Sequence, residues 1–214
     1  MRNGEKVMRI IGVTGGVGAG KSTVLKMLED MVSCIVIRTD EVAKETTMPG
    51  GEAYKDIVKL LGTDILQADG CIDRKKMAAR IFSDNVLCAK VDEIIHPLTR
   101  QEVIRRLKEA SGEGKYDYAF IEAALLIEAG YDDICEEFWY IYVPDEMRIE
   151  RLMSDRGYSR EKCISIMNNQ LSDEEFRRHC RYVIDNSEDS SMTRKRLKEI
   201  LFATENRTGG ENNE

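Results

Sequence analysis

Short apolar runs alternate with longer helical patterns along this chain of 214 residues. The runs are rich in β-branched and aromatic residues, which is typical of strands buried on both faces of a parallel sheet. Between them, apolar residues recur every three or four positions, as on one face of a helix. The alternation predicts one α/β domain with insertions. The predicted strands lie within residues 7–13, 34–37, 116–128, 138–143 and 182–186.

A glycine-rich segment joins the first predicted strand to a predicted helix at 22–31. From Gly15 to Ser22 it fits the phosphate-binding pattern of glycine, four residues, glycine, lysine and serine. Glycines allow backbone conformations that other residues avoid, so successive N–H groups can converge on phosphate oxygens at a helix N-terminus. The residues expected to bind the nucleotide are Gly16, Val17, Gly18, Ala19, Gly20, Lys21, Ser22 and Thr23.

The chemistry of this segment predicts a nucleoside triphosphate with Mg²⁺ as its ligand. Lys21 is expected to reach the β and γ phosphates. The Ser22 hydroxyl is expected to bind the Mg²⁺ that bridges them. A glycine-rich turn without a ligand is the structural alternative.

Asp40 follows the second predicted strand. In open α/β sheets, ligands bind beyond the carboxyl ends of the strands, so this carboxylate is expected to project toward the phosphate site. It could accept a proton from an attacking hydroxyl, or hold Mg²⁺ through water. The alternative is an N-cap for a helix beginning at Glu41, and the residues alone leave both interpretations open.

The following stretch, 41–114, is predicted to be a mainly helical insertion. Gly62 is placed to end one amphipathic helix, and Asp73 to cap the next. His96 precedes Pro97 inside a helical pattern, which marks a kink or boundary where a side chain can face a cleft. A packed structural histidine is the interpretation that the residues favour.

Two glutamates stand out where the chain returns to the sheet. Glu122 interrupts the apolar run at 116–128, and an unpaired buried carboxylate would be costly. At the end of a strand beside a phosphate loop it is placed to bind Mg²⁺ or its waters. Glu128 is a candidate for a substrate-side contact, with an exposed glutamate at a helix start as the alternative.

Arginines recur at near-helical spacing after the strand that ends before Pro144. In phosphoryl transfer such a segment can close as a lid and place guanidinium groups on the developing charge. A solvated, charged pair of helices is the alternative for most of them. The arginines concerned are Arg148, Arg151, Arg156, Arg160, Arg177, Arg178 and Arg181.

Composition limits the classes of binding partner that we expect for this protein. The formal net charge of −7 argues against a protein that binds nucleic acid by broad phosphate neutralisation, so a small-molecule partner is expected. The six cysteines have neither metal-site nor redox-motif spacing and are expected to be free thiols. The start of the chain is polar, and no apolar stretch approaches the roughly 20 residues that span a bilayer. We expect a cytoplasmic protein with no membrane partner.

Taken together, the motifs resemble those of the dephospho-coenzyme A kinases. The resemblance follows the family's order from Met8 to about Leu201, and its later motifs narrow the choice beyond the phosphate loop. The chain departs from the family at Arg38, where an aspartate is usual, and at Ala124, where a proline is usual. The matching segments are 12–24, Asp40, 51–54, 69–74, 81–82, His96–Pro97, 125–128, 151–153, Gln170 and 183–186.

The resemblance implies an α/β, three-layer P-loop kinase fold with a five-stranded parallel sheet, a helical insertion for the acceptor, and a lid. The implied reaction transfers the γ-phosphoryl of ATP to the ribose 3′-hydroxyl of dephospho-coenzyme A, the last step of coenzyme A biosynthesis. ATP and Mg²⁺ are the implied cofactors. The implied segments are a nucleotide-binding core at 7–40, 115–146 and 181–204, the acceptor insertion at 41–114, the lid at 147–180, and a disordered tail at 205–214.

The resemblance also assigns roles to residues. Its implied catalytic residues are Asp40 as base, Lys21, and Arg151 from the lid, and its acceptor-side residues are Asp40, His96 and Glu128. Two other functions stay open: a nucleoside-monophosphate-type kinase with another small-molecule acceptor, and a non-enzymatic nucleotide-dependent switch. An Asn-Lys-x-Asp motif is absent from the sequence, which counts against a GTPase switch. The oligomeric state stays open.

Overall fold

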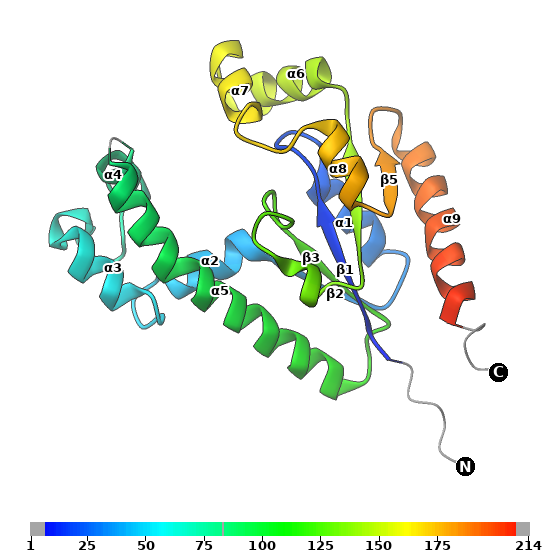
Figure 1. Cartoon of the computed structure of the whole chain (residues 1–214), viewed down its shortest axis with the longest axis horizontal. Helices are drawn as coiled ribbons and strands as arrows, with labels where there is room; N and C mark the ends of the chain where they lie inside the picture. The colour runs from blue at the N-terminus through cyan, green and yellow to red at the C-terminus, as the bar shows by residue number, and fades with distance from the viewer. Residues whose placement is uncertain (1–6, 83, 209–214) are drawn as a thin grey trace. The chain divides into compact units, whose positions relative to one another are not determined.

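A computed structural model describes residues 7–82 and 84–208. The chain forms two compact units (Figure 1). One comprises the described residues up to Val36 together with those from Gly114 onward, and it contains most of the sheet. The other, Ile37–Glu113, is mainly helical. All six cysteines are free thiols, as predicted.

The sheet has five parallel strands in the order β2-β3-β1-β4-β5, which confirms the predicted sheet. In the β1–β3 pair Val13 lies opposite Glu122, so the last residue of β3 lies beside the start of the glycine-rich loop. The strands are β1 (Arg9–Thr14), β2 (Cys34–Arg38), β3 (Tyr118–Glu122), β4 (Glu137–Tyr142) and β5 (Tyr182–Asp185).

Helices of the first unit bury the sheet. Ile11 and Val13 of β1 pack with Leu25 of α1 and Leu197 of α9 in one core. Phe176 of α8 stacks on Tyr140 of β4, with ring centroids 4.7 Å apart. The helices of this unit are α1 (Lys21–Glu29), α6 (Asp145–Arg156), α7 (Arg160–Met167), α8 (Asp173–His179) and α9 (Ser190–Thr208), with a 3₁₀ turn, η2, at Tyr131–Asp133.

The second unit has a small core of its own. Ile57 and Leu61 of α3 pack with Ile65, Ile72 and Val91. Gly62 ends α3, and the Asp73 carboxylate caps α4, as the sequence predicts. The elements of this unit are α2 (Thr39–Thr46), α3 (Tyr54–Leu61), a 3₁₀ turn η1 (Thr63–Ile65), α4 (Arg74–Ile81) and α5 (Asn85–Glu113).

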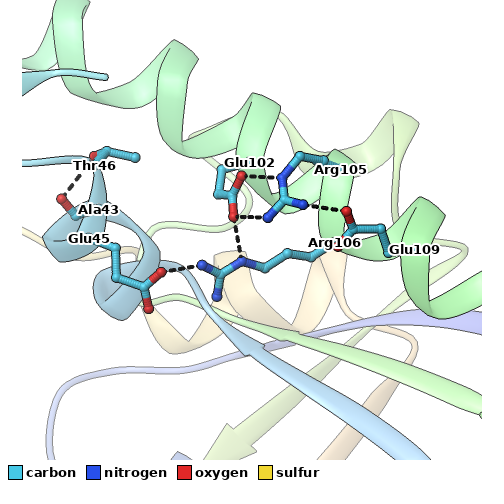
Figure 2. Close-up of polar contacts among 7 residues, drawn as sticks. All are labelled: Ala43, Glu45, Thr46, Glu102, Arg105, Arg106 and Glu109. Carbon is cyan, nitrogen blue, oxygen red and sulfur yellow. Dashed lines mark hydrogen bonds and ion pairs between the residues drawn. The ribbon is translucent and has the colours of Figure 1, made fainter. Parts of the chain in front are cut away.

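An ion-pair network joins α2 to α5 within the second unit (Figure 2). Arg106 of α5 pairs with Glu45 of α2 and with Glu102 of its own helix. Arg105 also pairs with Glu102, and with Glu109. Hydrogen bonds and charge from the two arginines, Arg105 foremost, lower the pKa of Glu102 to about 2. The network therefore fixes α2, which carries Asp40, against the long helix α5.

The structure decides two alternatives that the sequence left open at element boundaries. Helix α2 begins at Thr39 with Arg38 at its N-cap, so Asp40 lies in the first turn and does not cap a helix from Glu41. Helix α5 continues through Pro97, so no boundary falls at His96–Pro97. Buried residues on both sides of the proline, Val91 and Val103 among them, carry the helix across it because packing outweighs the lost hydrogen bond.

The last helix covers the first residues of the predicted tail segment. Helix α9 runs from Ser190 to Thr208. The buried side chain of Thr204 bonds the Ile200 carbonyl within that helix, and the Thr204 carbonyl accepts a bond from Arg9. Residues 209–214 lie outside the described part. Within it, no helix combines the length and apolar character needed to cross a bilayer.

Candidate active site

The glycine-rich loop between β1 and α1 has a backbone that only glycine adopts readily. Gly15, Gly18 and Gly20 have φ values of 143°, 84° and 81°. A Cβ on Gly15 would lie 2.5 Å from the Ile141 carbonyl oxygen, inside any allowed contact. A Cβ on Gly20 would lie 2.4 Å from Asn186 Nδ2. The spacing of glycines is therefore imposed by both conformation and close packing.

The N-terminus of α1 is built for an anion. Gly20 occupies its N-cap, and no side-chain cap or acidic first-turn residue is present there. Helices α2, α3 and α6 also lack a side-chain cap, but each has an acidic residue in its first turn. Uncapped amides and the positive end of the helix dipole favour a negatively charged ligand at such a position. This geometry fits phosphate at the loop.

Lys21 and Glu122 lie together beside the loop. Lys21 Nζ donates a hydrogen bond to the Gly15 carbonyl oxygen at 2.8 Å and lies 3.6 Å from the Glu122 carboxylate. Both side chains are largely buried, at 10% and 15% exposure. The sequence predicted both residues for this site, and the parallel pairing of β1 with β3 brings them together. An ammonium group and a carboxylate therefore lie next to a loop whose geometry fits a phosphate group.

Arg148 of α6 also contacts the loop. Its Nε donates to the Val17 carbonyl at 3.0 Å, and its Nη2 donates to Gln170 Oε1 at 3.1 Å. Gln170 Oε1 also accepts a bond from the Val17 amide at 3.0 Å. A Cβ on Gly16 would lie 2.0 Å from the Arg148 guanidinium, so a larger residue there would displace the guanidinium from this position. Arg148 is thus a buried loop contact and not a solvated surface charge.

Arg151 and Asn186 complete the polar surroundings of the loop. Arg151 Nη2 donates to the Asn186 carbonyl at 3.0 Å, and Nη1 donates to the Gly18 carbonyl at 3.5 Å. Asn186 Nδ2 donates to the Ala19 carbonyl at 2.9 Å, and Thr193 holds the amide oxygen of Asn186 at 3.2 Å. Loop carbonyl oxygens, which would repel phosphate, are therefore occupied by side-chain donors.

The remaining predicted site residues fall into three places. Ser22 and Thr23 are exposed in the first turn of α1. Asp40 is exposed in the first turn of α2, in the second unit. Glu128 is exposed in a turn before η2, so the alternative of a helix-start glutamate is wrong.

His96 also belongs to the second unit, and the favoured interpretation of a packed histidine is wrong. Its side chain is 66% exposed on α5, with Nε2 3.7 Å from Asp92. Pro97 follows it within the same continuous helix. An exposed ring on a regular helix is available to solvent and to a ligand.

Gln170 and Asn186 were not among the predicted site residues, and Arg148 was predicted only as one of seven candidate lid arginines. Each reaches the loop from more than 100 residues away in sequence. Gln170 and Asn186 could have been identified from the sequence because both lie in motifs that resemble those of the family. The spacing of the arginines could not distinguish Arg148 from the exposed arginines, because only the folded structure shows that Arg148 is buried.

The oxygen donors near the loop fit Mg²⁺. Ser22 offers a hydroxyl and Glu122 a carboxylate, which are hard ligands of the kind that Mg²⁺ prefers. Within residues 7–82 and 84–208 no group of three or more His, Cys, Asp or Glu side chains could hold a metal ion. Magnesium is commonly bound by one or two protein groups together with substrate phosphates, so this donor set suits it.

The five-stranded parallel sheet, the glycine-rich loop and its three cationic side chains define a P-loop kinase. A family model described as dephospho-CoA kinase matches residues 9–193. The chain therefore belongs to the dephospho-CoA kinase family.

Individual relatives agree with this membership. The chain is 39% identical over 193 residues to the dephospho-CoA kinase of Geobacter sulfurreducens, across 90% of this chain and 97% of that protein. It is 34% identical over 195 residues to that of Carboxydothermus hydrogenoformans, across 91% and 94%. The similarity thus extends over nearly the full length of this chain and of each relative.

Solved structures support the fold. TT1252 from Thermus thermophilus matches with a TM-score of 0.79 at 27% identity, over 93% of this chain and 98% of that one. The dephospho-CoA kinase from Campylobacter jejuni matches with a TM-score of 0.67 at 21% identity, over 90% and 94%. At that identity the second likeness speaks for the fold alone.

Proposed function

We propose that the protein transfers the γ-phosphoryl group of ATP to the ribose 3′-hydroxyl of dephospho-coenzyme A, giving coenzyme A and ADP. The observation that carries the proposal is the family match across residues 9–193, which includes both the phosphate loop and the helical unit. The geometry of the loop agrees with it, because an uncapped helix N-terminus and Lys21 suit the phosphates of a nucleotide donor.

In this proposal the loop residues 16–23 grip ATP, and cationic side chains stabilise the charge that moves during transfer. Lys21 would exchange its bond to the Gly15 carbonyl for the β and γ phosphates. Arg151 and Arg148, both hydrogen-bonded to loop carbonyls, would bear on the equatorial phosphate oxygens. The two arginines are hydrogen-bonded beside the loop before the reaction, which lowers the reorganisation that the transition state requires of them.

Asp40 is the proposed general base. Its carboxylate is exposed at the first turn of α2, where it can meet an acceptor hydroxyl. It would accept the proton of the 3′-hydroxyl as the oxygen attacks the γ-phosphorus, and ADP would leave. His96 and Glu128 are the proposed contacts to the acceptor.

Ser22 and Glu122 would hold Mg²⁺ with the phosphates. The ion supplies charge neutralisation between the β and γ groups when it is bound. We further propose that residues 41–114 bind the acceptor and residues 147–180 act as a lid over the nucleotide. A cytoplasmic location, and the lack of nucleic-acid and membrane partners, also stay predictions.

An acceptor panel tests the proposal against its alternatives. Purified protein is incubated with ATP, Mg²⁺ and one acceptor at a time, and ADP release is measured. Dephospho-coenzyme A should give turnover far above that with nucleoside monophosphates or with water. Preference for a nucleoside monophosphate would favour the other kinase class, and ATP binding without ADP release with any acceptor would favour a switch.

A further inference from the structure

The amide side chain of Gln170 joins two groups at the glycine-rich loop. Its Oε1 accepts a hydrogen bond from the Val17 amide at 3.0 Å and another from Arg148 Nη2 at 3.1 Å. An amide oxygen has two lone pairs, so these two bonds saturate it. Arg148 Nε in turn donates to the Val17 carbonyl at 3.0 Å. The two side chains therefore close a ring of hydrogen bonds around one loop residue, which we call the Val17 bridge.

The backbone of Val17 depends on this bridge for its hydrogen bonds. Within residues 7–82 and 84–208, no backbone group bonds the amide or the carbonyl of Val17. Val17 also lies between two glycines, Gly16 and Gly18, and glycine loses more conformational entropy on ordering than any other residue. The bridge thus fixes a part of the loop that its own sequence leaves free to move.

The position of Gln170 is itself fixed by the helices on both sides. Its backbone amide donates to the Met167 carbonyl at the end of α7, at 3.1 Å. Two residues later, Ser172 caps α8 in a capping box. Phe176 of α8 stacks on Tyr140 of β4. The amide that holds Val17 is therefore attached to the sheet through α8.

The acceptor in the bridge is neutral, which leaves the charge of Arg148 in place. Arg148 Nη1 lies 3.2 Å from Asp145 Oδ1, but the Asp145 side chain is 74% exposed, so solvent screens that pair. The Arg148 side chain is only 10% exposed. A carboxylate at position 170 would pair with the guanidinium at this buried place and repel phosphate, whereas an amide orients it without cancelling its charge.

We propose that Gln170 is a positioning residue for the nucleotide donor. It holds Val17 and Arg148 where the loop binds phosphate, and its neutral oxygen keeps the positive charge of Arg148 uncancelled. This inference rests on the proposed function and extends it to a side chain that acts through its neighbours, without contacting the phosphates.

Calorimetric titration of the full chain with a non-hydrolysable ATP analogue and Mg²⁺ tests the role. Gln170→Met keeps the length of the side chain but removes both hydrogen bonds, so the Kd should rise about tenfold. The KM for dephospho-coenzyme A should change by less than about twofold, because only the donor is affected. Asn169→Met removes the neighbouring exposed amide, which bonds the Ser165 carbonyl, and should stay near wild type. A wild-type Kd in Gln170→Met, or equal losses in both variants, would overturn the proposal.

Gln170→Glu separates positioning from a role in folding alone, and serves as the test if Gln170→Met does not fold. Glutamate keeps an acceptor for Val17 and Arg148, so the free energy of unfolding in urea should not fall below that of wild type. The added charge should still raise the Kd of the analogue by about threefold or more, and less at high salt. Wild-type affinity in Gln170→Glu would overturn the proposal.

A double-mutant cycle tests whether Gln170 acts through Arg148. In an Arg148→Met background, Gln170→Met should raise the Kd by less than about twofold further, because both changes break the same bridge. Losses that multiply would overturn the proposal while leaving the proposed function intact. Failure of wild type to bind the analogue would instead overturn the proposed function, and this inference with it.

Discussion

At the residue scale, the position of Lys21 beside the glycine-rich loop was predictable because its motif is local. Seven neighbouring positions and the flanking strand and helix specify its environment. The contacts of Arg148 and Asn186 were not predictable from local sequence, since they arise when α6 and β5 reach the loop in the folded chain. The exposure of Asp40 and His96 likewise depends on tertiary packing.

Replacing Lys21 should abolish most of the activity. Lys21→Met removes the ammonium group that is expected on the transferring phosphoryl group, so kcat/KM should fall by about 10²–10³. Lys26→Met, on the exposed side of the same helix, is the matched control and should stay near wild type. Equal kinetics for the two variants would dismiss Lys21 from catalysis.

Replacing Asp40 should lower turnover and leave the binding of ATP nearly unchanged. Asp40→Asn keeps the shape but cannot take a proton, so kcat should fall by about 10²–10⁴ while the KM for ATP changes little. Glu41→Gln, the next exposed carboxylate on α2, controls for the loss of one charge. Wild-type turnover in Asp40→Asn would show that another group is the base.

The buried hydroxyl of Thr14, directly before the loop, should lower the free energy of unfolding. Thr14 Oγ1 is buried and has no hydrogen-bond partner among the described residues. Thr14→Val should therefore raise the free energy of unfolding by up to about 1 kcal/mol, as measured by urea denaturation without ligand. The matched control, Thr193→Val, breaks a buried bond to Asn186 and should be destabilising. Equal losses in both variants would contradict the account of Thr14.

At the element scale, the sequence predicts helix ends where a single residue decides them. Gly62 ends α3 and Asp73 caps α4, and both were identified from their residue type. The residues left open whether Asp40 caps α2 and whether a kink or a boundary falls at Pro97; α2 begins at Thr39, and α5 continues through Pro97. In α2 no side chain caps the helix, and in α5 packing on both sides of the proline overrides its local effect.

The network between α2 and α5 should make stability depend on pH in acid. The pKa of Glu102 is lowered from 4.5 to about 2 by hydrogen bonds and charge, chiefly from Arg105. Its stabilising effect is therefore complete above pH 4.5 and is lost as the pH falls from 4.5 toward about 2. Because these charges are partly exposed and screened, the loss should be at most about 1 kcal/mol.

Urea denaturation of Glu102→Gln measures this loss. The variant should be less stable than wild type at about pH 6, and the difference should shrink at about pH 3. Glu93→Gln, an exposed site on the same helix, serves as control and should show no such change with pH. A Glu102→Gln difference that stays constant over this range would contradict the assigned role of the carboxylate.

At the scale of the whole molecule, the five apolar runs predicted the strands, and the resemblance supplied the parallel sheet and the kinase class. The strand order β2-β3-β1-β4-β5 could not be predicted from the apolar runs, because the order depends on how the crossover helices cover the two faces of the sheet. The division at Val36/Ile37 and Glu113/Gly114 assigns the loop and its cations to one unit and the helix that carries Asp40 to the other. The proposed reaction assigns the donor to the first unit, and the acceptor to the second unit together with Glu128 of the first.

The most direct test is the identity of the product. Protein, ATP, Mg²⁺ and dephospho-coenzyme A are incubated, ADP is quantified, and the product is analysed by mass spectrometry and phosphorus NMR. The account predicts a single added phosphate on the ribose 3′-oxygen, formed in equal amount to ADP. A phosphate at any other position, or ADP formed without a phosphorylated acceptor, would contradict it.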